Sequence, residues 1–238
     1  MVPAAGRGTR LGADGPKVLA PVAGRPMLDW LLDLYTSRVD QVVLVVSPGA
    51  REAVEAVARS HAVPVVIAIQ EAATGMLDAV RIGIDAAPLA DARVWITWCD
   101  QVAVHPRTLD RLRKIEAGTA LALPVVRQSP PYIHLERDAS GRIVAVRQRR
   151  EGDAMPPAGE SDMGLFSLSA QAAGPLLRLF DSQAHAAHGT GERNFLPFIP
   201  WLAAREEVRT FPATDPAEAI GINTPDDRAR VEAYLAAR

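Results

Sequence analysis

Compact apolar runs alternate with longer amphipathic segments through the first half of the chain. Four of the runs are typical of strands buried on both faces of a parallel sheet: residues 41–47, 63–69, 93–98 and 120–126. Between them, apolar side chains recur every three or four residues, which predicts helices over 26–36, 50–60, 75–86 and 106–117. With residues 1–4 as the end of a first strand, this alternation predicts an α/β fold with a doubly wound, mostly parallel, Rossmann-like sheet.

The pattern changes after residue 126. Residues 132–137 and 143–149 alternate apolar and polar positions around Asp138-Ala139-Ser140-Gly141, which predicts a small β-hairpin insertion. The stretch 151–161 is rich in proline, glycine and charged residues, so we expect a loop there and a return strand over 163–168.

The last third of the chain carries weaker signals. We expect a helix around 176–180 that Gly174 and Pro175 interrupt or shorten, then a helix over 195–204 and a short strand over 208–211. A final helix is predicted to run to Ala237, because Thr224 is a good N-cap and Pro225 suits the first helical turn.

Composition places the chain among globular proteins. Its 238 residues suit one domain that buries about 70% or more of the unfolded surface. The 26 basic and 28 acidic residues give a formal charge of −2, so neither a nucleic acid nor an anionic membrane is an expected partner. A single cysteine, Cys99, excludes an intramolecular disulfide, and no export signal or membrane span is apparent. We therefore expect a soluble, cytoplasmic protein of undetermined oligomeric state.

A glycine-containing segment at the start of the chain predicts a triphosphate-binding loop. It reads Ala4-Ala5-Gly6-Arg7-Gly8-Thr9-Arg10-Leu11, with Pro16-Lys17 shortly after it. The glycines let backbone N–H groups approach a polyphosphate, and Arg10 and Lys17 add positive charge. A P-loop is excluded because its lysine directly follows a glycine, whereas Lys17 follows Pro16. A dinucleotide fingerprint is excluded because Leu11 stands in place of its third glycine.

Two further polar segments follow predicted strands. Gln70 to Thr74 comes after the strand at 63–69, and Cys99-Asp100 comes after the strand at 93–98. Ligands of doubly wound sheets bind beyond the carboxyl ends of strands. We therefore expect the glycine loop and these two segments to meet in one crevice.

The glycine loop and its sequel carry a resemblance to a known family. The run AAGRGTRL, followed by PKVLAPVAGRPML, resembles the signature of the sugar-1-phosphate nucleotidyltransferases of the MobA-like NTP transferase superfamily, above all the N-acetylglucosamine-1-phosphate uridylyltransferase domain. The resemblance covers nearly the whole chain and implies a nucleotide-diphospho-sugar transferase fold in a single domain spanning 1–238. Residues 1–126 would mainly bind nucleotide, 127–212 would mainly bind the acceptor, and 213–238 would return to a metal site.

The resemblance also implies roles for individual residues. Arg10 would face the β- and γ-phosphates and Lys17 the phosphate nearer the reacting centre, as the catalytic pair. Asp100 and Asn223 would hold a metal, and one carboxylate with one amide oxygen suits Mg²⁺, which keeps waters and takes phosphate oxygens. The nucleotide-binding set would be Ala4, Ala5, Gly6, Gly8, Thr9, Gln70 and Thr74, with the last two on the base.

On the acceptor side the resemblance implies that Glu160 and Gly164 contact the sugar. Here the sequence departs from the family, since Tyr132-Ile133-His134-Leu135 stands where the family has Tyr-Gly-Arg-Ile, which leaves the identity of the sugar open. The arginines within 147–150 are either a solvated hairpin face or a contact to the acceptor phosphate.

The implied reaction joins a nucleoside triphosphate, with UTP favoured, to a sugar 1-phosphate and releases pyrophosphate. It needs alignment of two anions and neutralisation of charge on the leaving group, more than a base. Two alternatives stay open. One is a cytidylyl- or guanylyltransferase that acts on a phosphorylated alcohol or a molybdenum cofactor, and the other is a non-catalytic nucleotide sensor.

Overall fold

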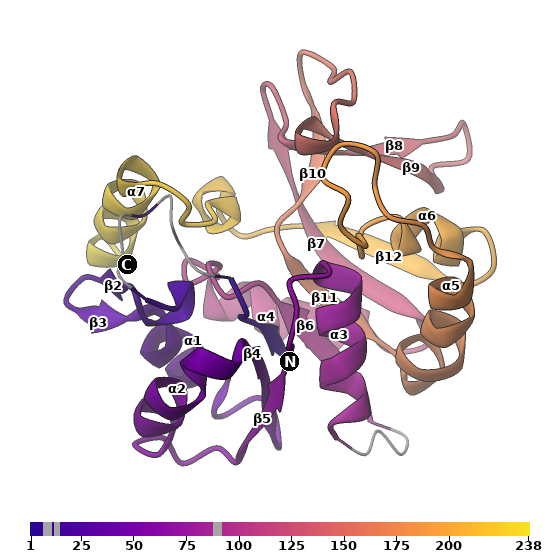
Figure 1. Cartoon of the computed structure of the whole chain (residues 1–238). Coiled ribbons are helices and arrows are strands. Elements are labelled where there is room, and N and C mark those ends of the chain that lie inside the picture. The colour runs from indigo at the N-terminus through magenta and orange to yellow at the C-terminus, as the bar shows by residue number, and fades with distance from the viewer. Residues whose placement is uncertain (7–10, 12–14, 88–91) are drawn as a thin grey trace.

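Parallel strands form one half of the central sheet in this computed structural model, which describes residues 1–6, 11, 15–87 and 92–238 (Figure 1). Strand β1 (Val2–Pro3) pairs with β4 (Val42–Val46), and β4 pairs with β5 (Val65–Ile69), all in parallel. On the other side, the Met1 amine donates to Trp95 O at 2.6 Å and Thr97 N donates to Met1 O at 3.1 Å. These bonds continue the parallel arrangement into β6 (Val94–Thr97).

The sheet becomes mixed beyond β6. Strand β11 (Leu165–Leu168) is antiparallel to both β6 and β7 (Leu121–Gln128), and β12 (Val208–Pro212) runs parallel to β7. Two short ribbons stand apart from the sheet. These are β2 (Pro21–Val22) with β3 (Arg25–Pro26), and the predicted hairpin, β8 (Ile133–Arg137) with β9 (Ile143–Gln148).

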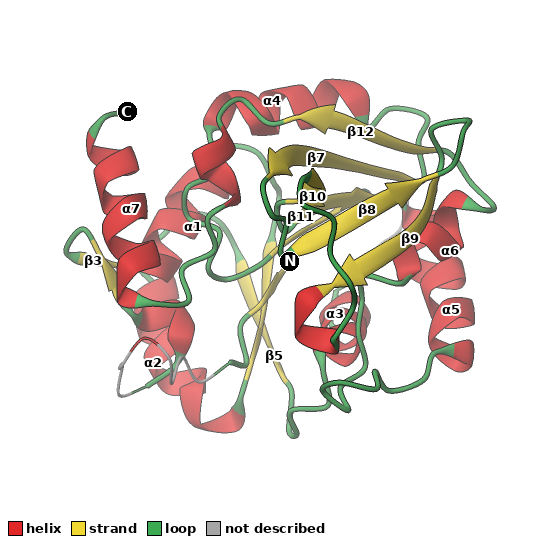
Figure 2. Ribbon diagram, turned by 90° about the horizontal axis from the view of Figure 1, so that it is seen from above, coloured by secondary structure: helices red, strands yellow, loops and turns green. Residues whose placement is uncertain are grey.

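Helices cover both faces of the sheet, as the doubly wound prediction requires (Figure 2). One core gathers buried side chains of α1 (Met27–Tyr35), α2 (Arg51–Ala58), α4 (Pro106–Ile115) and α7 (Pro225–Ala236). A second core gathers those of α3 (Met76–Asp85), α5 (Leu177–Gln183) and α6 (Phe198–Ala203). The predicted α/β class is thereby confirmed.

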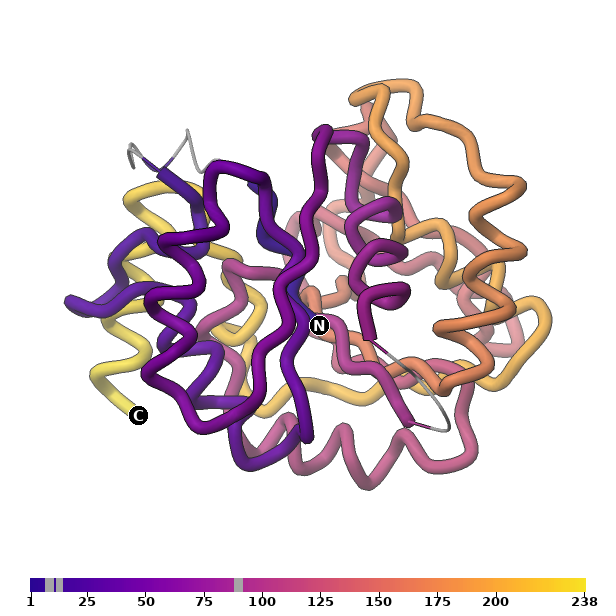
Figure 3. The backbone as a smooth tube through the Cα atoms, turned by 60° about the horizontal axis from the view of Figure 1, so that its bottom comes forward, coloured from indigo at the N-terminus to yellow at the C-terminus, as the bar shows by residue number. Residues whose placement is uncertain are grey.

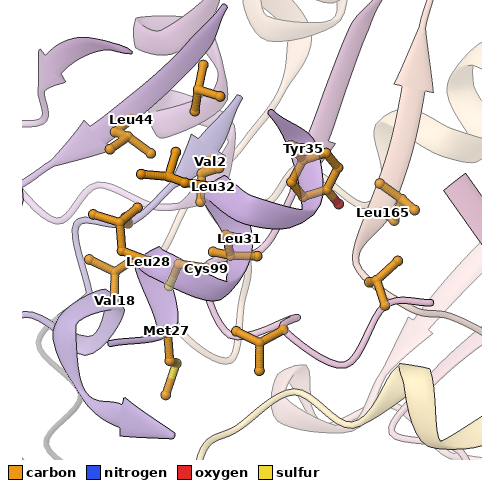
Figure 4. Packing of buried hydrophobic residues seen from close by; sticks show 14 of the residues in the cluster. Val2, Val18, Met27, Leu28, Leu31, Leu32, Tyr35, Leu44, Cys99 and Leu165 are labelled. Atoms are coloured by element: carbon orange, nitrogen blue, oxygen red, sulfur yellow. The ribbon is translucent and has the colours of Figure 1, made fainter. Parts of the chain in front are cut away.

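The period of two along the strands explains the two cores. In β6, Trp95 belongs to the first core and Ile96 to the second, and Leu165 and Phe166 divide in the same way in β11. Figure 4 shows part of the first core, where Val2 of β1 lies beside Leu32 of α1 and Leu28 lies beside Val18. A strand apolar at successive positions is therefore buried on both faces.

One expected loop contains a strand. Residues 159–162 form β10 (Gly159–Asp162), antiparallel to the end of β7, and its first three residues fall in the stretch 151–161 that the sequence predicted to be a loop. Its residues, Gly-Glu-Ser-Asp, have low strand propensity, so the pairing depends on the exposed edge of β7 rather than on local preference. β7 itself extends to Gln128, beyond the predicted end at 126.

Local chemistry accounts for two other predicted features. The β8–β9 turn is held by Asp138, whose Oδ1 accepts from Ser140 N at 2.9 Å and from Arg142 N at 3.1 Å. Gly174 and Pro175 lie in a π-helical turn over Ala172–Leu176 that leads directly into α5. Among the residues that the structure describes, none of the helices has both the length and the apolar character needed to cross a bilayer.

Candidate functional site

Three segments from distant parts of the chain meet at the ammonium group of Lys17. Lys17 Nζ lies 2.5 Å from Asp100 Oδ2 and 2.8 Å from Asn223 Oδ1. The Lys17 and Asp100 side chains are only 13% and 14% exposed, so water screens their attraction weakly. We refer to these three residues as the lysine cluster. The structure thus brings together the predicted catalytic lysine and both predicted metal ligands.

The backbone around Lys17 fixes where its side chain begins. Lys17 opens a 3₁₀ turn (Lys17–Leu19), and its N–H donates to Gly6 O at 3.1 Å, which ties it to the glycine loop. The next residue, Val18, is fully buried in the first core with Leu28 and Cys99 (Figure 4). Anchoring of Val18 directs the neighbouring lysine toward the edge of the sheet.

Asp100 follows β6 at the carboxyl edge of the sheet. The turn that presents it is held by bonds from Trp98 N to Gly164 O at 3.0 Å and from Gln101 N to Trp98 O at 3.1 Å. Cys99, beside it, is buried, and burial raises the pKa of its thiol to about 12. The thiol therefore stays protonated and serves as a small core residue.

Asn223 reaches the cluster through a close backbone approach. A Cβ on Gly221 would lie 3.3 Å from the Asp100 carboxyl carbon, and Ile222 N donates to Asp100 O at 3.2 Å. The Asn223 amide is oriented by its Nδ2, which donates to Gly221 O at 3.1 Å, so that Oδ1 faces Lys17.

The predicted nucleotide-binding residues lie at the same edge of the sheet. Buried Ala4 donates to Val45 O at 2.7 Å, and Gln70 N donates to Val46 O at 2.9 Å, so the strand pairing continues past β1 and β5. Ala5 is partly exposed and Gly6 is exposed beside them. The predicted residues Gly8, Thr9 and Arg10 lie outside the described part of the chain.

Gln70 and Thr74 are joined to the start of α3. Gln70 Nε2 donates to Gly75 O at 3.1 Å and to Thr74 Oγ1 at 3.4 Å. Gly75 has a φ of +121°, and a Cβ there would meet the backbone carbonyl of Arg193. The predicted base segment is therefore a tight turn that depends on a glycine.

Arg193 is a residue that the sequence did not single out. Its backbone bonds to both sides of Gly75, since Arg193 N donates to Thr74 O at 2.9 Å and Leu77 N donates to Arg193 O at 3.0 Å. Its guanidinium donates to Asp78 Oδ1 at 2.7 Å and to Asp181 O at 2.7 Å. Arg193 thus ties the base segment to the second half of the chain, and no local sequence pattern indicates such a pairing.

The contacts of the two predicted acceptor residues are made with residues other than Lys17, Asp100 and Asn223. Glu160 on β10 accepts from Arg137 Nε at 2.7 Å, and Arg137 also donates to Thr210 Oγ1 at 2.8 Å. Gly164 has a φ of +71°, and its Cα packs against the Trp98 indole. The Glu160 carboxylate is therefore already balanced by an arginine.

Buried polar groups near β10 were also missed from sequence. Asp162 is buried, and this burial raises its pKa to about 6. Its Oδ1 accepts from Gly164 N at 2.8 Å, whereas its buried Oδ2 has no hydrogen-bond partner among the described residues. Asn194 Nδ2 donates to Gln148 Oε1 at 2.5 Å, with both side chains buried. For Asp162 the available signal was its place among polar residues directly before the return strand.

Two of the three arginines within 147–150 are paired with acids, whereas Arg149 donates to Pro131 O at 3.3 Å. Arg147 donates to Glu136 Oε2 at 2.7 Å, and Arg150 pairs with Glu192 at 3.0 Å. These ion pairs favour the solvated hairpin face over a contact to phosphate. Within the described ranges, no group of three or more His, Cys, Asp or Glu side chains is placed to hold a metal.

Comparison with known proteins assigns a family to this geometry. The model of the MobA-like NTP transferase domain matches residues 1–161, more than half of the chain. The chain belongs to this family. MobA-like NTP transferase membership agrees with polar residues gathered at the carboxyl ends of β1, β5 and β6.

Curated relatives of this MobA-like NTP transferase cover nearly all of it. The bifunctional protein GlmU of Alkalilimnicola ehrlichii is 34% identical over 230 residues, which are 94% of this chain and 47% of that protein. GlmU of Halorhodospira halophila is 33% identical over 98% of this chain and 48% of its own length. The chain spans about half the length of the curated relatives it matches.

Solved structures show the same fold. A nucleotidyl transferase from Methanothermobacter thermautotroptrophicus superposes with a TM-score of 0.67 at 21% identity and covers 100% of this MobA-like NTP transferase and 97% of its own chain. HddC from Yersinia pseudotuberculosis superposes with a TM-score of 0.70 at 17% identity, over 98% and 97%. At these identities the likeness establishes the fold alone.

Proposed function

We propose that the chain is a Mg²⁺-dependent nucleotidyltransferase that joins a nucleoside triphosphate to a sugar 1-phosphate, acting in the cytoplasm. The observation that carries the proposal is the lysine cluster, in which a cation and two oxygen ligands meet at the carboxyl edge of the sheet. In the proposed division of labour, 1–126 bind the nucleotide, 127–212 the acceptor, and 213–238 complete the metal site.

The donor atoms of the cluster fit a divalent metal. Asp100 Oδ2 and Asn223 Oδ1 already converge on one positive charge, the Lys17 ammonium, at 2.5 and 2.8 Å. A carboxylate and an amide oxygen are hard ligands, which Mg²⁺ prefers and supplements with water and phosphate oxygens. Asp100 and Asn223 would hold the ion, which when bound supplies charge to neutralise the phosphates and the leaving group.

The chemistry needs no enzyme nucleophile. A phosphate oxygen of the sugar 1-phosphate forms a bond to the α-phosphorus of the triphosphate, and the bond from that phosphorus to the bridging β-phosphate oxygen breaks, which releases pyrophosphate. Lys17 carries three N–H donors, and its contacts to Asp100 and Asn223 use two of them. We propose that a metal on Asp100 and Asn223 would release the Lys17 ammonium to a phosphate oxygen, and Arg10 is proposed for the outer phosphates.

Specificity is assigned to the two sides of the cluster. On the nucleotide side, Gln70 and Thr74 are proposed to read the base, with UTP favoured by the resemblance of this segment. On the acceptor side, Glu160 and Gly164 remain the proposed sugar contacts. Because Glu160 is paired with Arg137, a sugar hydroxyl would meet the ion pair rather than an isolated carboxylate.

The direct test is pyrophosphate release by purified protein with Mg²⁺, over a grid of five nucleoside triphosphates and a panel of sugar 1-phosphates and phosphorylated alcohols. Release that requires UTP and one sugar 1-phosphate supports the proposal. Release with CTP and a phosphorylated alcohol, or with GTP and a molybdenum cofactor, would establish the alternative enzymes. Triphosphate binding without release from any pair would support the nucleotide sensor.

Removal of the proposed metal ligand tests the mechanism itself. We expect Asp100→Ala to lower turnover by about two orders of magnitude or more, the range seen when a group that stabilises transition-state charge is lost. The fold should persist, because the Asp100 carboxylate contacts the cluster and not a hydrophobic core. Near-normal turnover with Mg²⁺ in a folded variant would rule out the metal assignment.

A further inference from the structure

A strap formed by residues 213–223 crosses from β12 to α7 and delivers Asn223 to the cluster. In Figures 1 and 3 the yellow end of the chain leaves the half of the molecule that holds β12 and runs to α7 beside the first core. Because the strap crosses between two parts of the molecule, the position of Asn223 depends on the hydrogen bonds that hold the strap to the rest of the protein.

Glu218 anchors the middle of the strap. Its side chain is fully buried in a 3₁₀ turn (Pro216–Ala219), where an ionised carboxylate is stable only if its oxygens are satisfied. Oε2 accepts from His105 N at 2.8 Å, and Oε1 accepts from Thr108 Oγ1 at 2.9 Å. These donors belong to the start of α4, so the carboxylate joins the strap to a helix of the first core.

Asp227, in the first turn of α7, anchors the C-terminal end of the strap. Its Oδ2 accepts from Asn223 N at 3.1 Å and from Thr224 N at 2.9 Å, within the capping box of α7. Between the two anchors, Ile222 is fully buried and bonds through its N–H to Asp100 O. The backbone of Asn223 is thereby held between two carboxylates that do not themselves contact Lys17.

We propose that Glu218 and Asp227 are positioning residues that set the affinity of the site for a divalent metal by fixing Asn223; the proposal rests on the function proposed above. An amide oxygen attracts a cation far less than a carboxylate does, so its contribution depends on its being held in place before the metal arrives. Mg²⁺ demands near-ideal ligand geometry, which makes small displacements of the strap costly.

The experiment compares Glu218→Gln and Asp227→Asn with a control, Glu116→Gln. Glu116 is also a largely buried carboxylate, and it accepts hydrogen bonds from Trp95 Nε1 and Ser167 Oγ, each at 2.6 Å. Neither donor belongs to the lysine cluster or the strap. Mn²⁺ binding is titrated by electron paramagnetic resonance in the presence of UTP, or of the triphosphate that supports pyrophosphate release. The thermal midpoint of each variant is measured on the same samples.

We expect Glu218→Gln and Asp227→Asn each to raise the Mn²⁺ concentration for half-saturation at least fivefold, and Glu116→Gln to change it less than twofold at a comparable loss of thermal midpoint. In an Asn223→Ala background, Glu218→Gln should cause no further loss of Mn²⁺ affinity, because the ligand it positions is gone. If Glu218→Gln and Asp227→Asn bound Mn²⁺ with the same affinity as the control Glu116→Gln, the positioning roles would be overturned. Failure of the wild-type protein to bind Mn²⁺ with any triphosphate would instead overturn the proposed function.

Discussion

At the residue scale, the most informative contact is the one between Lys17 and the two oxygens of Asp100 and Asn223. The ammonium lies where both oxygens converge, so it balances the Asp100 charge. A metal held by the same oxygens would compete with it. Phosphate oxygens of a bound nucleotide can accept hydrogen bonds from the displaced Lys17 ammonium. Binding of the metal would therefore be coupled to binding of the nucleotide.

Lys17→Met tests this competition. We expect turnover to fall by about two orders of magnitude or more, because charge neutralisation at the phosphates is lost. Mn²⁺ should bind the variant more tightly than the wild type when nucleotide is absent, because the competing ammonium is gone. Isothermal titration calorimetry measures this, with Lys114→Met on the exposed side of α4 as the matched control. Unchanged Mn²⁺ affinity in Lys17→Met would contradict the inference that the ammonium and the metal occupy the same position between Asp100 and Asn223.

Asp162 gives a pH-dependent prediction. Its pKa is raised from 3.8 to about 6 by burial, so the folded state holds the proton more tightly than the unfolded state. The unfolding free energy therefore falls as pH rises from about 4 to about 6. Above that range the lost stability is not regained. A shift of about two pKa units corresponds to about 3 kcal/mol. Asp162→Asn does not titrate there and keeps an acceptor for Gly164 N.

The thermal midpoint of Asp162→Asn relative to wild type should thus increase between pH 4 and pH 7. Asp138→Asn is a suitable control, because that carboxyl lies on an exposed turn and its pKa is lowered by a hydrogen bond from Ser140. Its relative midpoint should fall over the lower part of the same range. A pH-independent difference for Asp162→Asn would show that Asp162 is not held as a buried acid.

At the element scale, the start of α3 depends on pairing with a segment more than a hundred residues away. Arg193 bonds to Thr74 and Leu77, and the turn between them requires the positive φ of Gly75. This arrangement holds Gln70 against Gly75 O. The base segment is therefore shaped by both halves of the chain.

Gly75→Ala should disturb both the turn and the contact with Arg193. We expect the unfolding free energy to fall by about 2 kcal/mol or more, since strain at positive φ adds to the clash with the Arg193 carbonyl. Gly118→Ala separates the two causes, because Gly118 also has a positive φ, +72°, but open space around its Cα. Triphosphate affinity, measured by fluorescence titration, should fall in the first variant only; equal effects at both glycines would exclude the Arg193 contact as the cause.

At the scale of the whole molecule, residues near both ends of the chain complete one site. Lys17 follows the glycine loop and Asn223 precedes the last helix, and the Met1 bonds to Trp95 and Thr97 keep the parallel strands between them continuous. Binding of a triphosphate with metal should therefore stabilise distant segments together.

Hydrogen exchange detected by mass spectrometry can test this coupling. Addition of the triphosphate with Mg²⁺ should slow amide exchange in 16–19, 99–102 and 220–224 at the same ligand concentration. The tip of the β8–β9 hairpin at 138–141 provides an internal reference that should not change. Protection limited to 16–19 would mean that the strap does not take part in binding.

Much of the fold and the core of the site could be predicted from the sequence because their signals are local. Near-continuous apolar runs marked the buried strands, and a period of 3.6 marked α1 to α4. The N-cap Thr224 and Pro225 marked α7, and polar residues after strands marked the edge where ligands bind. Lys17, Asp100 and Asn223 were identified by resemblance to a family, and the structure brings them into contact.

Only the tertiary structure decided which distant groups meet. The pairing of β10 with β7, the balance of Glu160 by Arg137, the burial of Asp162 and the anchoring of the strap by Glu218 all depend on partners far away in the chain. Periodicity reports which face of an element is buried, but hydrogen bonds and ion pairs depend on which elements become neighbours. The sequence therefore determined the fold class and which polar residues gather at the carboxyl ends of β1, β5 and β6, and packing decided how those residues are satisfied and positioned.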